Sequence, residues 1–217
     1  MKICNFFDLD KSIASRLLLC SEYPWDALDM LGEYILRVGR GLSPCKYEQV
    51  RRGVWIARDA DACDSAQLIA PLIIDSGARI DGNTLLRTVI IGKGAFVGRF
   101  SEISYTVLFD GARAGQRNYI SDSIVGYGAS FGASAMVSSR SSAASGISLL
   151  LDGEIISCSR RKFGAVVGDG ATVGCSSVLM AGCTLDRGAS VPALTRARGY
   201  ISGECAYRGE KIASDVL

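Results

Sequence analysis

Residues 74–108 read IDSGARIDGNTLLRTVIIGKGAFVGRFSEISYTVL, and the spacing of the apolar residues in this stretch decides the fold. An aliphatic residue returns every six positions, at Ile74, Ile80 and Leu86, before the frame slips by one and resumes at Ile91. Such a short fixed period is typical of solenoids, in which each unit contributes one strand and one turn. The stretch therefore predicts a parallel β-helix.

The same period extends in both directions from this stretch, from residue 56 to residue 137 and again from 167 to 191. Four residues after each aliphatic position the side chain is usually small, which gives one large and one small inward position in each unit of a narrow prism. The five-residue units are expected to place larger residues at this second inward position, and these are Ile90, Val107 and Ile124.

An ordinary β-sandwich is the main alternative, but its strands would alternate with a period of two and would be separated by turns every 8–12 residues. The strict six-residue frame argues against it. We expect an all-β protein: a left-handed parallel β-helix of hexapeptide repeats over residues 51–195, with a small N-terminal helical cap.

The first 50 residues follow helical spacing instead. Asp10 is placed to cap a helix that ends near Leu19, and Pro24 is placed to begin a second helix over residues 25–38. Because a β-helix leaves an open apolar end, we expect this helical cap to cover the first coil. A role in substrate binding is the alternative.

The frame is lost between residues 138 and 162, where we expect an inserted loop with a hairpin that turns at Asp152 and Gly153. The loop ends in the basic run of residues 160–162, which suits phosphate oxygens, although an exposed charged run is the simpler interpretation. Residues 196–217 are expected to form a tail, with Arg208 and Lys211 as further basic residues.

Composition excludes several functions. The net charge is only +2, from 24 basic and 22 acidic residues, so no basic field for nucleic acid is present. No apolar stretch is long enough to span a membrane, and we expect a cytoplasmic protein with reduced cysteines. The chain has eight cysteines without a C-x-x-C pair and no histidine, which argues against a metal site and removes imidazole as a general base.

Three stretches are specific enough to suggest a family: residues 100–138, which include Gly-Gln-Arg-Asn-Tyr-Ile-Ser-Asp at 115–122, residues 161–169, and residues 23–28. Together they resemble the acetyltransferase domain of the bacterial N-acetylglucosamine-1-phosphate uridyltransferase/glucosamine-1-phosphate acetyltransferase, and especially its short stand-alone relatives. The resemblance covers nearly the whole chain.

The resemblance implies a homotrimer with sites between neighbouring prisms, acetyl-CoA or another acyl-CoA as donor, and a sugar phosphate or sugar nucleotide as partner. It places two residues at the reaction centre, Glu102 and Gln116. The residues that it implies for substrate binding are Arg87, Asn118, Tyr119, Arg161 and Lys162, and those for the coenzyme are Ala133, Cys175 and Ala193.

Gln116 departs from the family motif, which has a histidine there, and Ser130 and Ser139 stand where the family has asparagines. Acyl transfer to an amine needs a base, which contributes about 10²–10⁴-fold to the rate, and glutamine cannot accept the proton. One hypothesis is an acyltransferase for a glucosamine-1-phosphate-like acceptor in which Glu102 or water is the base.

Two other hypotheses remain open. The chain is alternatively a non-catalytic trimeric scaffold that binds a sugar nucleotide or an acyl-CoA. Nucleotidyl transfer is less favoured, because a Gly-rich loop before a helix in an α/β domain is absent from these 217 residues and a separate chain would have to supply it.

Overall fold

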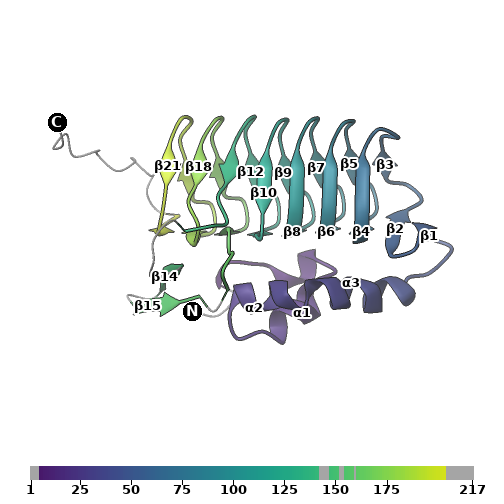
Figure 1. Cartoon of the computed structure of the whole chain (residues 1–217), viewed down its shortest axis with the longest axis horizontal. Coiled ribbons are helices and arrows are strands. Elements are labelled where there is room, and N and C mark those ends of the chain that lie inside the picture. Colours follow the sequence, from purple (N-terminus) through teal and green to yellow (C-terminus); the bar gives the residue numbers. More distant parts are fainter. Residues whose placement is uncertain (1–4, 142–146, 152–153, 159, 204–217) are drawn as a thin grey trace.

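The computed structural model describes residues 5–141, 147–151, 154–158 and 160–203. It is a left-handed parallel β-helix whose coils stack along the long axis of the molecule (Figure 1). Equivalent strands of successive coils pair in parallel, and the register places Ile80 beside Val97 and Val97 beside Ala114. The fold class predicted from the six-residue period is confirmed.

The prism has three faces. Strands β4, β6 and β8 each bend around a corner of the prism. In β8, for example, the first half pairs with the strand at residues 119–121 and the second half pairs with the strand at residues 124–125. The bounds of these strands are β4 (Gln67–Ile74), β6 (Leu85–Ile91) and β8 (Glu102–Leu108). Their first halves begin the first face, and their second halves follow β2 (Val54–Ala57) on the second face, where Val54 pairs with Leu72.

The remaining strands continue these faces. The first face adds β10 (Tyr119–Ser121), β13 (Met136–Val137), β18 (Val178–Leu179) and β21 (Arg196–Ala197). The second face adds β11 (Ile124–Val125), β16 (Ala165–Val167), β19 (Cys183–Leu185) and β22 (Tyr200–Ile201). The third face consists of β3 (Asp61–Ala62), β5 (Arg79–Ile80), β7 (Phe96–Val97), β9 (Arg113–Ala114), β12 (Ser130–Phe131), β17 (Thr172–Val173) and β20 (Ser190–Val191).

Side chains from the three faces fill the prism, and the predicted large and small inward positions form one continuous buried cluster. The prediction for the five-residue units is wrong, because Ile90, Val107 and Ile124 point outward into a second buried cluster. Val89 packs in the prism in place of Ile90. The physical reason is the period of two within a strand, which puts neighbouring residues on opposite sides.

The second cluster lies between the second face and the N-terminal segment, which contains a 3-10 helix η2 (Leu9–Lys11) and helices α1 (Ser15–Leu19), α2 (Pro24–Asp29) and α3 (Leu31–Arg40). The helices run alongside the coils in Figure 1 and do not close their end. Phe7 packs on Phe109 at 5.0 Å between ring centroids, and Trp25 packs on Phe163 at 5.5 Å. The helical cap therefore covers a lateral face, and the expectation that it covers the first coil is wrong.

Two helix predictions also need correction. The predicted helix from Asp10 to Leu19 is divided into η2 and α1, and Asp8 caps η2 by accepting the Asp10 N–H. The predicted helix over residues 25–38 is divided at Met30, which ends α2 and begins α3. Pro24 begins α2 as predicted, since its fixed φ suits the first helical turn.

Carboxylates at the corner between the second and third faces join successive coils to the N-terminal segment. Asp169 accepts hydrogen bonds from the backbone N–H of Tyr127 at 2.8 Å and of Asp8 at 2.6 Å, and its own N–H donates to Phe6 O at 3.0 Å. Asp110 accepts from Lys93 N–H at 2.8 Å in the same way. These bonds fix the segment that precedes the helices along this corner.

Two hairpins depart from the parallel pattern. Strand β1 (Tyr47–Arg51) pairs antiparallel with β2 (Val54–Ala57), and the inserted loop contains β14 (Ser148–Leu151) paired antiparallel with β15 (Glu154–Ser157). The predicted turn at Asp152 and Gly153 lies outside the described residues, as do Arg208 and Lys211. Because β21 and β22 continue the coils, the β-helix extends beyond the predicted boundary at residue 195.

Among the described residues, no helix has both the length and the apolar character that a membrane span requires.

Candidate functional site

A hollow of about 440 Å³ lies on the first face, and we call it the first hollow. Four of the residues that the resemblance implies for the reaction centre or for substrate binding line it, namely Arg87, Glu102, Tyr119 and Lys162. They come from β6, β8, β10 and the end of the inserted loop, so the hollow joins three successive coils to a segment that lies far away in the sequence.

The parallel register explains why these side chains meet. Glu102 pairs with Tyr119, and Tyr119 with Met136, so the three form one column on the outer surface of the face. Arg87 pairs with Ser104 two positions further along, and this places it in the neighbouring outward column. Residues 17 positions apart in the sequence therefore lie one coil apart in space.

The corner between the first and second faces forms one wall of the hollow. Thr88, Tyr105 and Asp122 occupy equivalent positions there and all adopt the left-handed backbone conformation, which non-glycine residues rarely adopt. Tyr105 is 42% exposed and lines the hollow, and Asp122 is almost fully buried. The tight corner thus presents an aromatic ring and a carboxylate to the site.

Arg160 anchors the end of the inserted loop through two ion pairs and a hydrogen bond. Its guanidinium contacts Asp122 at 3.1 Å and Asp29 at 3.3 Å, and its Nε donates to Lys162 O at 3.0 Å. The side chain is mostly buried, and it connects helix α2 to the corner beside the hollow. Within the basic run, only Lys162 lines the hollow, whereas Arg161 is exposed and does not line it.

Asn118 does not belong to the site. Its side chain is 2% exposed and turns into the prism, where Nδ2 donates to Gly132 O at 2.7 Å and to Ala135 O at 3.2 Å. Neighbouring residues of a strand point to opposite sides, so an outward Tyr119 requires an inward Asn118. We therefore correct the prediction that Asn118 binds substrate.

Gln116 and the three residues implied for the coenzyme occupy one ridge, at the corner between the third and first faces. Ser134 N–H donates to Gln116 O, Ser176 N–H to Ala133 O, and Leu194 N–H to Cys175 O, each at 2.9 Å. These bonds show that Gln116, Ala133, Cys175 and Ala193 take the same position in successive coils. Gln116, Cys175 and Ala193 are exposed, so the ridge is open to a ligand that lies along it.

In each coil, the ridge residue comes about three positions before the residue that lines the first hollow, as Gln116 does before Tyr119. Gln116 itself does not line the hollow. Ser139 lines the hollow, but Ser130 is on the third face and does not. Sequence reasoning missed Tyr105, Arg140 and Met136, which also line the hollow. Met136 was detectable, because it lies 17 residues after Tyr119 in the same frame.

No family model matches the chain, and no curated protein matches it either. Solved structures do match the chain. A mutant of perosamine N-acetyltransferase from Caulobacter crescentus, in complex with CoA and GDP-perosamine, has a TM-score of 0.31 and 18% identity, covering 67% of this chain and 53% of that chain. The chain thus spans about half the length of that protein.

Two other solved structures also match the chain. The hexapeptide transferase family protein from Anaplasma phagocytophilum has a TM-score of 0.36 and 22% identity, covering 68% of this chain and 76% of that chain. A mutant of AntD, an N-acyltransferase from Bacillus cereus in complex with dTDP and coenzyme A, has a TM-score of 0.39 and 14% identity, covering 69% and 72%. All three TM-scores are below 0.5, and the assignment of the fold rests on the strand register of the chain itself.

Proposed function

We propose that the protein is an acyl-CoA-dependent acyltransferase that acylates the amine of an amino-sugar phosphate. The observation that carries the proposal is the meeting of Glu102 with the cations of Arg87 and Lys162 in one hollow, beside a ridge of small and polar residues. A carboxylate between cations suits an acceptor with an amine and a phosphate, because each group then faces an opposite charge.

In this proposal, Lys162 and Arg87 bind the phosphate oxygens and Tyr119 positions the sugar ring. Glu102 accepts a proton from the attacking amine, which is the step that histidine performs in the related motif. Gln116 donates a hydrogen bond from its amide to the thioester carbonyl, where negative charge develops during attack, and this donation requires no change of protonation. Ala133, Cys175 and Ala193 line the path of the coenzyme.

The first test uses calorimetric titration with acetyl-CoA, followed by thiol release with glucosamine-1-phosphate as acceptor. We expect saturable binding and acceptor-dependent thiol release, with a fall of about 10²–10⁴-fold in kcat for Glu102→Gln. Glu33→Gln is the matched control, because Glu33 is exposed on α3 and lies outside the hollow. Undiminished turnover in Glu102→Gln would exclude Glu102 as the base.

A non-catalytic binding protein is the second candidate, and the observation that favours it is Gln116 at the place of the motif histidine. This candidate predicts binding of acetyl-CoA or of a sugar nucleotide without thiol release. GDP-linked and dTDP-linked amino sugars are the sugar nucleotides to test. A gain of thiol release in Gln116→His would favour this candidate, because it would show that only the base is missing.

We also propose that the working form is a homotrimer, in which the open side of the first hollow faces a neighbouring prism. Exposed apolar side chains line the first hollow, among them Met136 and Tyr105. Analytical ultracentrifugation should give about three times the mass of 23.0 kDa. A monomer at micromolar concentration would contradict the shared site.

A further inference from the structure

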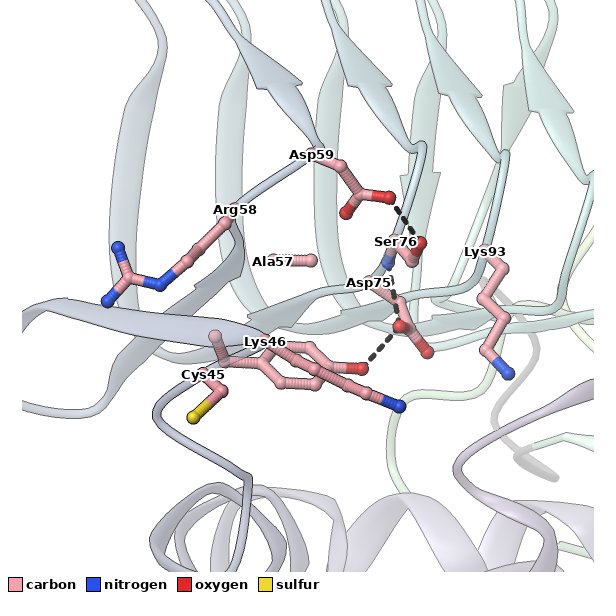
Figure 2. Close-up of a pocket in the computed structure, with 9 residues that line it drawn as sticks. Cys45, Lys46, Ala57, Arg58, Asp59, Asp75, Ser76 and Lys93 are labelled. Carbon is pink, nitrogen blue, oxygen red and sulfur yellow. Dashed lines mark hydrogen bonds between the residues drawn. The ribbon is translucent and has the colours of Figure 1, made fainter.

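A second hollow, of about 650 Å³, lies at the corner between the second and third faces in the first coils. Its walls come from Cys45 to Tyr47 at the start of β1 and from the turns that follow β2, β4 and β6 (Figure 2). It shares no lining residue with the first hollow. Its volume falls within the range of about 300–1,000 Å³ that is usual for small-molecule sites.

A buried carboxylate forms the floor of the second hollow. Asp75 is 2% exposed, and its Oδ1 accepts hydrogen bonds from Tyr47 Oη at 2.5 Å and from Ser76 N–H at 2.7 Å. No hydrogen bond to Oδ2 is made by any described residue. Asn118 Oδ1 is the only fully buried side-chain atom without a partner in the described residues, and Asp75 is among the residues that line the second hollow.

Two lysines extend into the same space. Figure 2 shows the side chains of Lys46 and Lys93 coming from separate segments and ending near Asp75, and both residues line the second hollow. Within the described part of the chain, neither ammonium group forms a hydrogen bond or a close ion pair, and the Asp110 carboxylate is the charge that attracts Lys93 from the neighbouring turn. Arg58 differs, because its guanidinium contacts Glu48 at 3.5 Å and its Nε donates to Pro44 O at 3.2 Å.

Two ammonium groups beside a carboxylate favour a ligand that carries both an anionic group and a hydroxyl. The ammonium groups attract an anion. The Asp75 carboxylate repels a bare anion, but it accepts a hydrogen bond from a hydroxyl, and Tyr47 and Ser76 hold the carboxylate in place for this purpose. We propose that the second hollow binds a phosphorylated sugar or polyol, with the phosphate between Lys46 and Lys93 and a hydroxyl on Asp75.

The Asp59 carboxylate is the second acceptor for hydroxyls at this site. It already accepts a hydrogen bond from Ser76 Oγ at 2.6 Å, and it faces the hollow from the turn after β2. Because the sugar contacts come from the coil turns and one phosphate contact comes from the segment before β1, ligand binding would connect the N-terminal segment to the β-helix.

The test is calorimetric titration of the full-length protein with glucose 6-phosphate, and with glucose and inorganic phosphate as separate probes. We expect saturable binding of glucose 6-phosphate at least tenfold tighter than that of either fragment. The double variant Lys46→Met/Lys93→Met should weaken it at least tenfold, whereas Lys46→Arg/Lys93→Arg, which keeps both charges, should retain it.

Lys162→Met removes a phosphate contact proposed for the first hollow, so the titrations are repeated in this background, where the saturable site of the second hollow should remain. Three results would overturn the proposal: no saturable binding, loss of binding in Lys162→Met with the double methionine variant unaffected, or inorganic phosphate binding as tightly as glucose 6-phosphate. These outcomes are independent of acyl transfer, because the thiol-release assay monitors the first hollow only.

Discussion

Asn118 stabilises a corner of the coil from inside the prism. Its Nδ2 donates to two backbone carbonyls of the next coil, so the amide closes a turn in which the strand hydrogen bonds are interrupted. Ser101 performs the same function one coil earlier, where its hydroxyl donates to Gly115 O at 2.9 Å. Polar residues inside this prism thus satisfy backbone groups that apolar residues would leave unpaired.

Replacing Asn118 with Asp should destabilise the protein by about 3 kcal/mol or more, because a carboxylate would be buried against two carbonyl oxygens without a donor. Urea denaturation followed by circular dichroism measures the change. Asn83→Asp is the matched control, since Asn83 is exposed at the same kind of corner and should change stability by less than about 0.5 kcal/mol. Equal effects of the two changes would refute this role of Asn118.

Tyr47 contributes a hydrogen bond to a buried carboxylate. Burial and the neighbouring Asp75 raise the pKa of the Tyr47 phenol above its ordinary value of about 10. The neutral, donating form is therefore favoured in the folded state. Tyr47→Phe should cost about 1.5–3 kcal/mol near pH 7, the value typical of a hydrogen bond to a charged group.

The stability difference between the wild type and Tyr47→Phe should depend on pH in one direction. A raised pKa in the folded state means that the stabilisation is fully present below pH 10 and is lost as the pH rises from there toward the folded-state pKa. The stability advantage of the wild type over Tyr47→Phe should thus shrink above about pH 10. Urea denaturation at pH 8 and at pH 10.5–11 provides the measurement, and an advantage that grows with pH would contradict it.

At the scale of elements, the second face is covered on both sides. Pairs of adjacent apolar residues recur in its strands, as in Ile90–Ile91 and Val107–Leu108, with one residue of each pair in the prism and the other against the N-terminal helices. Gly39 permits this contact, because a Cβ there would lie 2.4 Å from the Trp55 ring. Helix α3 therefore packs directly on the strands.

Ile90 and Ile69 provide a matched test of this arrangement. Both point outward on neighbouring strands, but Ile90 is fully buried beneath the helices and Ile69 is 37% exposed on the first face. We expect Ile90→Ala to cost about 2–5 kcal/mol and Ile69→Ala to cost less than about 1 kcal/mol in urea denaturation. Similar costs for the two would show that the helices contribute little to stability.

At the scale of the whole molecule, the N-terminal segment and the β-helix form one unit through the stripe of outward residues on the second face. The stripe consists of Ile73, Ile90, Val107, Ile124 and Val166. An exposed apolar stripe of this kind would promote association. The helices therefore serve solubility as well as stability.

Deleting residues 1–42 should accordingly yield a protein that aggregates and binds a hydrophobic dye such as ANS. The same deletion combined with threonine at the five stripe positions should remain dispersed, which dynamic light scattering measures. If the deletion alone stays monodisperse without binding the dye, the stripe does not need the helices as a cover.

Much of the first hollow was predictable, because a repeat of 17 residues brings Arg87, Glu102 and Tyr119 onto neighbouring coils whatever the rest of the chain does. Lys162 was identified through a resemblance, and only the ion pairs of Arg160 show how its loop reaches the hollow. Asn118 was misplaced because a motif carries no information about which side of a strand each residue takes.

The sequence by itself determined the β-helix and the inward residues of its six-residue units, because a six-residue period is a local property that each coil repeats. Only the tertiary structure decided where the helices pack and which residues form the second hollow. The 17-residue repeat places Asp59, Ser76 and Lys93 in equivalent turns of successive coils, but Tyr47 belongs to a segment that the repeat does not include. The contacts of Tyr47 depend on how the N-terminal segment lies against the β-helix. The packing of the helices on the outward stripe sets that placement.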